Sequence, residues 1–174
     1  DNECYTNNVN INITISDDNL ANSNIILNEQ LMNEHINVSK EQAYELHVSA
    51  EDKAGNIAAE SAEFKIDKTP PVVKVSGIQN GKIYFNVNLD ISVYEDKLNT
   101  DDSAILFNNT NYITGLRNIQ GEEGKYWKLN ITNIQQKEFY EIEYNIYDCA
   151  GWNTKDAVRI GIFPKFMVTN LTFA

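Results

Sequence analysis

Residues 44–56 read YELHVSAEDKAGN, and residues 140–153 repeat the pattern as YEIEYNIYDCAGWN. Tyr44 aligns with Tyr140 and Asp52 with Asp148, each pair 96 residues apart. In both copies apolar residues occupy every second position, which is the period of a half-buried β-strand, and a turn that contains glycine follows. A repeat of this length predicts two copies of one small β domain, because solenoids repeat in much shorter units.

Matching strand patterns lie on both sides of each copy. VNINITI begins at Val9 and VNLDISV at Val87, and their alternation predicts strands with one face in water. After the turn of the first copy a further strand is expected, with Ala62, Phe64 and Ile66 facing inward. The sequence therefore predicts an all-β chain.

The segment between the two copies reads DKTPP at 67–71. Two consecutive prolines hold the backbone near polyproline II and predict a short, stiff linker. The first strand of the second domain is expected at Val72 to Val75, turned back by a hairpin at Asn80-Gly81. The second copy also carries extra residues, which predict a long loop over Thr114 to Gly124 that either serves function or tolerates insertion.

These patterns divide the chain into three parts. Residues 1–67 are expected to form a domain without its first strand, and residues 68–164 a domain with a long inserted loop. Residues 165–174 have the pattern of a first strand again, so they are expected to begin a further module or a tail. The fragment is thus expected to come from a longer array.

Composition limits the partners. The net charge is −11 and the isoelectric point is near 4.5, which disfavours nucleic acid and anionic membrane surfaces as partners. No apolar run approaches the roughly 20 residues that a membrane span needs. The negative charge instead favours a soluble acidic surface, a cation as partner, or both.

Tyr44 to Pro71, with its YxLxVxAxDxAGN run, its FKID strand end and its KTPP linker, resembles the tandem immunoglobulin-like repeats of bacterial surface proteins. It is also similar to fibronectin type III modules. The resemblance implies two tandem immunoglobulin-like β-sandwiches, in which the repeated stretch is strand F and its turn the F–G loop. Tyr44 and Tyr140 would then be tyrosine corners, whose hydroxyls bond nearby backbone.

The implied topology brings the B–C and F–G loops of the second domain to the pole that faces the linker. The carboxylates expected there are Asp67, Glu95, Asp96 and Asp148. Calcium accepts six to eight oxygens in a flexible geometry, so this set is a candidate interdomain calcium site. The alternative is that Asp52 and Asp148 bond the backbone of their own turns while the other carboxylates are solvated. Calcium is the one cofactor that the sequence suggests.

The same implied topology also places the two cysteines. Cys4 aligns with Ile83 at the expected start of strand B, and Cys149 lies in the second F–G turn, so both fall near the linker. They are either an interdomain disulfide, as exported proteins retain, or two free thiols.

Catalytic motifs are absent from the sequence. It contains no GxSxG, HExxH, CxxC or glycine-rich phosphate loop, and one of its two histidines, His47, falls on the outward face of its strand. We therefore expect no enzyme. Among the aromatic residues of the second domain, Trp127 and Trp152 could stack on a ligand, with core and junction packing as the alternative.

The expected function is a non-catalytic stalk or spacer segment of a bacterial surface or secreted adhesin-like protein, outside the cell. Its partners would be neighbouring modules of the same chain, and its junction would be stiffened by calcium or by the disulfide. The alternatives are a module that binds glycan or host protein through the loops of the second domain, and an accessory region of an exported glycosidase. Fold alone does not decide between them.

Overall fold

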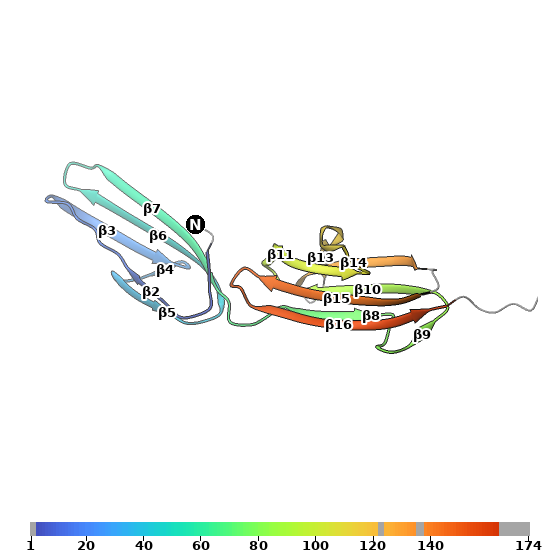
Figure 1. The fold of residues 1–174 in the computed structure, drawn as a ribbon. Helices are drawn as coiled ribbons and strands as arrows, with labels where there is room; N and C mark the ends of the chain where they lie inside the picture. The colour runs from blue at the N-terminus through green and yellow to red at the C-terminus, as the bar shows by residue number, and fades with distance from the viewer. Residues whose placement is uncertain (1–2, 122–123, 135–137, 164–174) are drawn as a thin grey trace, which may run out of the picture. The chain divides into compact units, whose positions relative to one another are not determined.

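The computed structural model describes residues 3–121, 124–134 and 138–163, and these residues form an all-β protein (Figure 1). The chain divides into two units. The first comprises Asp1–Thr69 with Cys149–Gly151, and the second comprises Pro70–Asp148 with Trp152–Ala174. The tail expected over 165–174 lies outside the described residues.

Unit 1 is built from two sheets. Its strands are β1 (Glu3–Tyr5), β2 (Val9–Asn12), β3 (Leu20–Leu27), β4 (Gln30–Leu31), β5 (His35–Val38), β6 (Gln42–Asp52) and β7 (Ile57–Ile66). The larger sheet has the order β1-β7-β6-β3-β4, and β2 pairs with β5 in the smaller one. All of these pairings are antiparallel except the one between β1 and β7, which is parallel.

Unit 2 has the same plan with more strands. They are β8 (Val72–Ser76), β9 (Ile83–Tyr84), β10 (Val87–Tyr94), β11 (Leu98–Phe107), β12 (Thr110–Asn111), β13 (Arg117–Gly121), β14 (Gly124–Ile134), β15 (Glu138–Asp148) and β16 (Asn153–Ile162), with the 3₁₀ turn η1 (Ile113–Gly115) before β13. One sheet has the order β13-β14-β10-β8 and the other β12-β11-β15-β16-β9.

The strand orders identify the fold. In unit 2, β8, β10, β14 and β13 correspond to strands A, B, E and D, and β12, β11, β15 and β16 to C′, C, F and G. In unit 1, β3, β6 and β7 are C, F and G, and β2 and β5 are B and E. Both units are immunoglobulin-like β-sandwiches. The repeated stretch forms β6 and β15, which are 11 residues long and adopt the role of strand F, as the sequence predicted.

Alternation along the strands builds the two cores. In β10 the residues at every second position are buried, with Leu89, Ile91 and Val93 fully so, and they pack on Ile142 and Ile146 of β15. The smaller core of unit 1 is formed by eight residues, which are Ile25, Leu27, Ile36, Val38, Tyr44, Leu46, Phe64 and Ile66. Phe64 and Ile66 are buried as expected, but the prediction for Ala62 was wrong, because β7 is exposed from Ile57 to Glu63.

Two predicted connections also differ from the structure. The loop expected over Thr114 to Gly124 contains the end of η1 and the edge strand β13, which pairs with β14 from Arg117 to Gly121. Asn80-Gly81 does not close a hairpin, since β8 pairs with β10 while β9 pairs in parallel with β16. The side chain of Asn80 accepts the Arg159 amide at 2.9 Å and the Gly81 amide donates to the Arg159 carbonyl at 2.7 Å, so this turn is attached to β16 and carries the chain to the other sheet.

Candidate functional site

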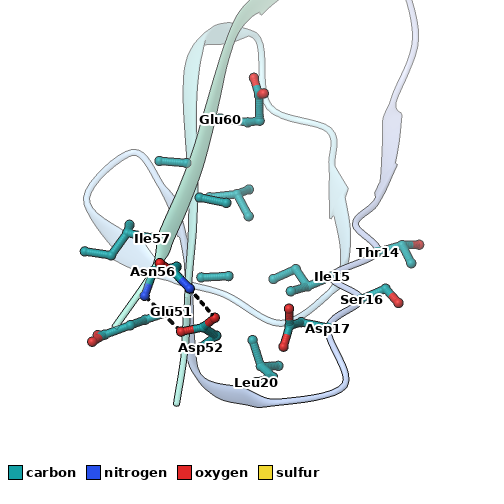
Figure 2. A pocket seen from close by; sticks show the side chains of 14 residues that line it. Thr14, Ile15, Ser16, Asp17, Leu20, Glu51, Asp52, Asn56, Ile57 and Glu60 are labelled. Carbon is teal, nitrogen blue, oxygen red and sulfur yellow. Dashed lines mark hydrogen bonds between the residues drawn. The ribbon is translucent and has the colours of Figure 1, made fainter. Parts of the chain in front are cut away.

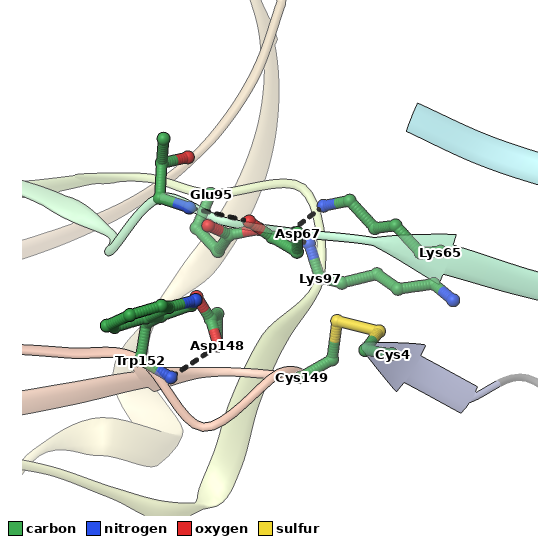
Figure 3. The surroundings of a disulfide bond; sticks show 9 residues. Cys4, Lys65, Asp67, Glu95, Lys97, Asp148, Cys149 and Trp152 are labelled. Carbon is green, nitrogen blue, oxygen red and sulfur yellow. Dashed lines mark hydrogen bonds and ion pairs between the residues drawn. A yellow bond between two sulfur atoms is a disulfide. The ribbon is translucent and has the colours of Figure 1, made fainter. Parts of the chain in front are cut away.

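Cys4 and Cys149 are joined by a disulfide, with an S–S distance of 2.03 Å and a Cα–Cα distance of 5.6 Å (Figure 3). Cys4 lies in β1, and Cys149 lies in the turn between β15 and β16. The Cα separation is within the range that a disulfide spans without moving the backbone. The bond closes a covalent loop across a sequence separation of 145 residues.

Cys4 lies on a short strand of its own, which the sequence pattern does not distinguish from strand B. Cys4 was expected at the start of strand B, but β1 is a separate short strand that precedes β2. It pairs in parallel with the end of β7, so that Cys4 lies opposite Lys65, and the Asp67 amide donates to the Tyr5 carbonyl at 2.9 Å. In unit 2, Ile83 has the same place opposite Gly161 of β16, so the alignment of Cys4 with Ile83 agrees with the strand pairing.

A buried ion pair lies at the end of β7. Nζ of Lys65 is 2.7 Å from Oδ2 of Asp67, and the two side chains are 10% and 2% exposed (Figure 3). The Thr69 amide also donates to Oδ1 of Asp67. Removing one partner of such a pair leaves a buried charge uncompensated, which typically costs about 3–5 kcal/mol. This pair was not predicted from the sequence, although a spacing of two residues in an extended chain places both side chains on one face.

The next residues continue this polar network on unit 1. Thr69 Oγ1 donates to Oε1 of Glu41 at 2.7 Å, and this bond holds the pKa of Glu41 below its ordinary value. Nζ of Lys68 donates to the Ser39 carbonyl at 2.6 Å. The DKT segment is thus attached to unit 1 immediately before the two prolines.

Asp52 organises the turn that ends the first copy of the repeat. Its Oδ1 accepts the amides of Ala54 and Asn56 at 2.8 and 2.9 Å, and its Oδ2 accepts the Asn56 side chain at 2.7 Å. The Asn56 side chain, followed by the turn amides, lowers the pKa of Asp52. Gly55 has φ +86°, a conformation that glycine adopts without steric cost.

Asp148 occupies the same position in the second copy. Its Oδ1 accepts the Trp152 amide at 2.9 Å, its own amide donates to the Trp152 carbonyl at 3.0 Å, and it is fully buried. Both aspartates therefore bond the backbone of their own turns, which is one of the two roles considered from the sequence.

Two of the other predicted calcium ligands, Asp67 and Glu95, bond residues of their own units. Asp67 holds Lys65, and Oε1 of Glu95 accepts the Lys97 amide at 3.0 Å, while Asp96 is exposed between β10 and β11. Asp67 belongs to unit 1, and Glu95, Asp96 and Asp148 to unit 2. Calcium binding by the four carboxylates stays a prediction.

The two repeat tyrosines are buried in equivalent places. The Tyr44 hydroxyl donates to the Lys40 carbonyl at 2.8 Å, which is the geometry of a tyrosine corner, and its ring stacks on Phe64 with centroids 4.9 Å apart. Tyr140 is 4% exposed and stacks on Phe107 with centroids 5.0 Å apart.

The aromatic residues of unit 2 differ in their surroundings. Trp127 is half-buried against the core, and its indole Nε1 donates to the Glu95 carbonyl at 3.0 Å. Trp152 is 40% exposed beside the turn that carries Cys149. The rings of Tyr94 and Tyr126 stack, and the ammonium group of Lys74 lies 4.6 Å from the centroid of the Tyr94 ring. His47 is exposed and pairs with Glu45 at 2.9 Å.

No protein-family model matches the chain, and no curated protein matches its sequence. Several solved structures are similar to it over most of its length. One is the Bacteroides ovatus mixed-linkage glucan utilization locus protein SGBP-B in complex with a mixed-linkage heptasaccharide, at 14% identity over 91% of this chain and with a TM-score of 0.32. The match spans 42% of the length of that protein.

Two titin structures are also similar. The titin domains Z1Z2 in complex with telethonin match at 12% identity, over 94% of this chain and 91% of that one, with a TM-score of 0.38. A second tandem of titin immunoglobulin domains matches at 11% identity, over 83% and 82% of the two chains, with a TM-score of 0.34. The assignment of the fold itself rests on the strand orders given above. None of the described residues forms a helix long and apolar enough to span a membrane.

Proposed function

We propose that the chain is a non-catalytic spacer, a stalk segment of a bacterial surface or secreted adhesin-like protein, and that it works outside the cell. Its partners are neighbouring modules of the same chain. The observation that carries this proposal is the disulfide between Cys4 and Cys149, because it closes most of the chain into one covalent loop.

The covalent loop has a mechanical consequence. Tension applied at the two ends of the chain passes from Cys4 to Cys149 through the sulfur atoms, so the residues between them are not extended. An extended chain spans about 3.3–3.6 Å per residue. The residues inside the closed loop would therefore add roughly 500 Å to the stretched length if the disulfide were broken. The strands of unit 1 and β8 to β15 of unit 2 lie inside the loop, and β16 lies outside it.

Two further observations support the spacer. The DKT segment is fixed to unit 1 by Lys68 and Thr69, and Pro70 and Pro71 follow directly, so little free chain remains between the sandwiches. Disulfides persist in oxidising surroundings, which supports a location outside the cell. In this role the disulfide keeps the covalent loop between Cys4 and Cys149 closed under load.

The alternative of a glycan- or host-protein-binding module has one observation in its favour, the exposure of Trp152. The other candidate ring, Trp127, is half-buried and its N–H group is already bonded to Glu95. The inserted residues form a strand and a 3₁₀ turn in place of a long open loop. The spacer is therefore the better supported function.

The experiment compares the oxidised chain with Cys4→Ser/Cys149→Ser in equilibrium unfolding, and screens both on a glycan array and by pull-down with host extracellular matrix proteins. We expect no saturable binding, and a loss of about 2–5 kcal/mol in unfolding free energy for the double variant. Saturable glycan binding that Trp152→Ala abolishes would overturn the proposal in favour of the binding module.

A further inference from the structure

The turn at Asn80 and Gly81 connects the two sheets of unit 2. It lies between β8, which pairs with β10, and β9, which pairs in parallel with β16 (Figure 1). The Lys82 amide donates to the Gln79 carbonyl at 3.2 Å and closes the turn around Asn80 and Gly81. These two residues are exposed, so water has access to both.

Asparagine followed by glycine deamidates readily, because glycine has no side chain to hinder its own amide nitrogen, and the sequence contains this dipeptide only here. In the reaction the Gly81 nitrogen loses its proton and attacks Cγ of Asn80. The new N–C bond replaces the bond from Cγ to Nδ2, and Nδ2 takes a proton from water and leaves as ammonia. Water then opens the resulting succinimide ring to aspartate or isoaspartate, and nothing is oxidised or reduced.

β16 holds both of the reacting groups. The Gly81 amide donates to the Arg159 carbonyl at 2.7 Å, so the nitrogen that must lose its proton is engaged in a hydrogen bond. Oδ1 of Asn80 accepts the Arg159 amide at 2.9 Å, which fixes the carboxamide toward β16. Both bonds go to backbone groups of one residue, so separation of the turn from β16 breaks them together.

This attachment of the turn is short and local. Beyond Arg159, the Gly161 amide donates to the Lys82 carbonyl and the Phe163 amide to the Tyr84 carbonyl, each at 2.9 Å. On its other side β16 pairs with β15 along its whole length, from Asn153 to Ile162. β16 also follows Cys149, so it lies outside the covalent loop and its separation from the turn does not require the disulfide to break. Such a short attachment can open without global unfolding.

We propose that Asn80 is a self-modification site, which is closed while the turn is bonded to β16 and deamidates when the two separate. Isoaspartate adds a methylene group to the main chain, so the turn can no longer make both of its bonds to Arg159. The modified turn therefore keeps a permanent record of the separation and holds β16 more weakly afterwards. This proposal stands independently of the spacer function.

Asn56 offers a comparison within the same chain. It is also exposed in a turn, and its side chain donates to Oδ2 of Asp52 at 2.7 Å (Figure 2). The residue that follows is Ile57, whose β-branched side chain hinders attack by its own amide nitrogen. Asn56 therefore lacks the intrinsic reactivity of Asn80, and it shows whether any deamidation is general to exposed turn asparagines.

The test incubates the full oxidised chain at mildly alkaline pH beside a free peptide of residues 77–84, and follows aspartate and isoaspartate at position 80 by mass spectrometry of proteolytic fragments. Asn80 should react at least about tenfold more slowly in the folded chain than in the peptide, while Asn56 should stay unmodified. Folding should slow the hydrogen exchange of the Gly81 amide by a similar factor, because both reactions need the same opening.

A pair of variants separates the backbone bond from the side chain. Arg159→Pro removes the amide that holds Asn80, whereas the control Arg159→Ala keeps that amide and loses only the side-chain bond to Glu141. Deamidation at Asn80 should be roughly fivefold or more faster in Arg159→Pro than in Arg159→Ala, as the loss of one hydrogen bond predicts. Circular dichroism checks that both variants fold.

Each result decides the proposal. Asn80 that reacts as fast in the folded chain as in the peptide would overturn it, and so would equal rates in two folded Arg159 variants. If Arg159→Pro does not fold, the comparison with hydrogen exchange in the unchanged protein decides instead. A slowing of deamidation that differs from that of the Gly81 exchange by more than about tenfold would then show that β16 does not control the reaction.

Discussion

The side-chain amide of Asn56 donates to Oδ2 of Asp52 at 2.7 Å, across the turn that ends the first copy of the repeat. This bond and those from the turn amides lower the pKa of Asp52. A carboxyl group whose pKa is lowered by folding stabilises the protein above its unfolded pKa of about 3.9, and loses that contribution as the pH falls through the folded value. The turn therefore makes stability depend on pH on the acidic side.

We predict that Asp52→Asn lowers the melting temperature at pH 7, because asparagine keeps an acceptor oxygen but loses the charge. The difference from the unchanged protein should shrink as the pH falls below about 4, where the carboxylate is protonated as well. Asn56→Ala should act in the same direction and more weakly. Calorimetric melts between pH 2 and 7 measure this, and a constant difference over that range would contradict it.

The tyrosine corner of unit 1 gives a second prediction. Tyr44→Phe removes the hydroxyl that bonds the Lys40 carbonyl while keeping the ring on Phe64, and should cost about 1 kcal/mol of unfolding free energy. Tyr5→Phe is the matched control, since the Tyr5 hydroxyl bonds Glu3 at an exposed position. Urea unfolding compares the two variants. Equal losses would show that the bond to Lys40 has no special role.

Two glycines with the same backbone conformation should differ in their tolerance of a side chain. Gly77 and Gly55 both have φ +86°, but a Cβ on Gly77 would lie 2.1 Å from the Asn88 carbonyl oxygen, while a Cβ on Gly55 meets nothing within 4 Å. We expect Gly55→Ala to cost about 1–2 kcal/mol, the price of the left-handed conformation. Gly77→Ala should cost about 3 kcal/mol or more, since backbone must also move. Similar losses in denaturant unfolding would contradict the predicted clash.

Calcium binding by Asp67, Glu95, Asp96 and Asp148 is a prediction that melting can test directly. At a calcium concentration about ten times the dissociation constant, the stabilisation is roughly 1.4 kcal/mol, which raises the melting temperature by a few degrees. Asp96→Asn, at an exposed position, should reduce this rise, and magnesium at equal ionic strength should not reproduce it. If EDTA and calcium give the same melting temperature, the four carboxylates do not bind calcium.

The sequence predicted the elements whose signal is local and repeated. β6, β10 and β15 follow from strict alternation, because burial of one face imposes a period of two on the sequence. The hydrogen bond of the Tyr44 hydroxyl and the turn capped by Asp52 could also be predicted. A tyrosine at the start of strand F and an aspartate before an AGN turn commonly bond nearby backbone. The pair Cys4 and Cys149 could be named because the chain contains two cysteines and the topology assigned both to the linker.

Features that depend on distant partners could not be predicted in this way. β13 has the sequence RNIQG, which lacks alternation, and its strand form comes from pairing along β14. Asn80-Gly81 has the strongest local hairpin signal, but its bonds to Arg159 carry the chain to the opposite sheet. Lys65 is buried because Asp67 neutralises it, and a charge on a strand otherwise indicates an exposed face.

The most direct measurement of the central claim is single-molecule stretching of the chain from its two ends. With the disulfide intact, we predict that complete unfolding releases roughly 100 Å, from the residues outside the Cys4–Cys149 loop. With reductant, or in Cys4→Ser/Cys149→Ser, the release should increase by roughly 500 Å, as the loop opens and both sandwiches unfold. Equal lengths with and without reductant would contradict the claim that the disulfide carries the load.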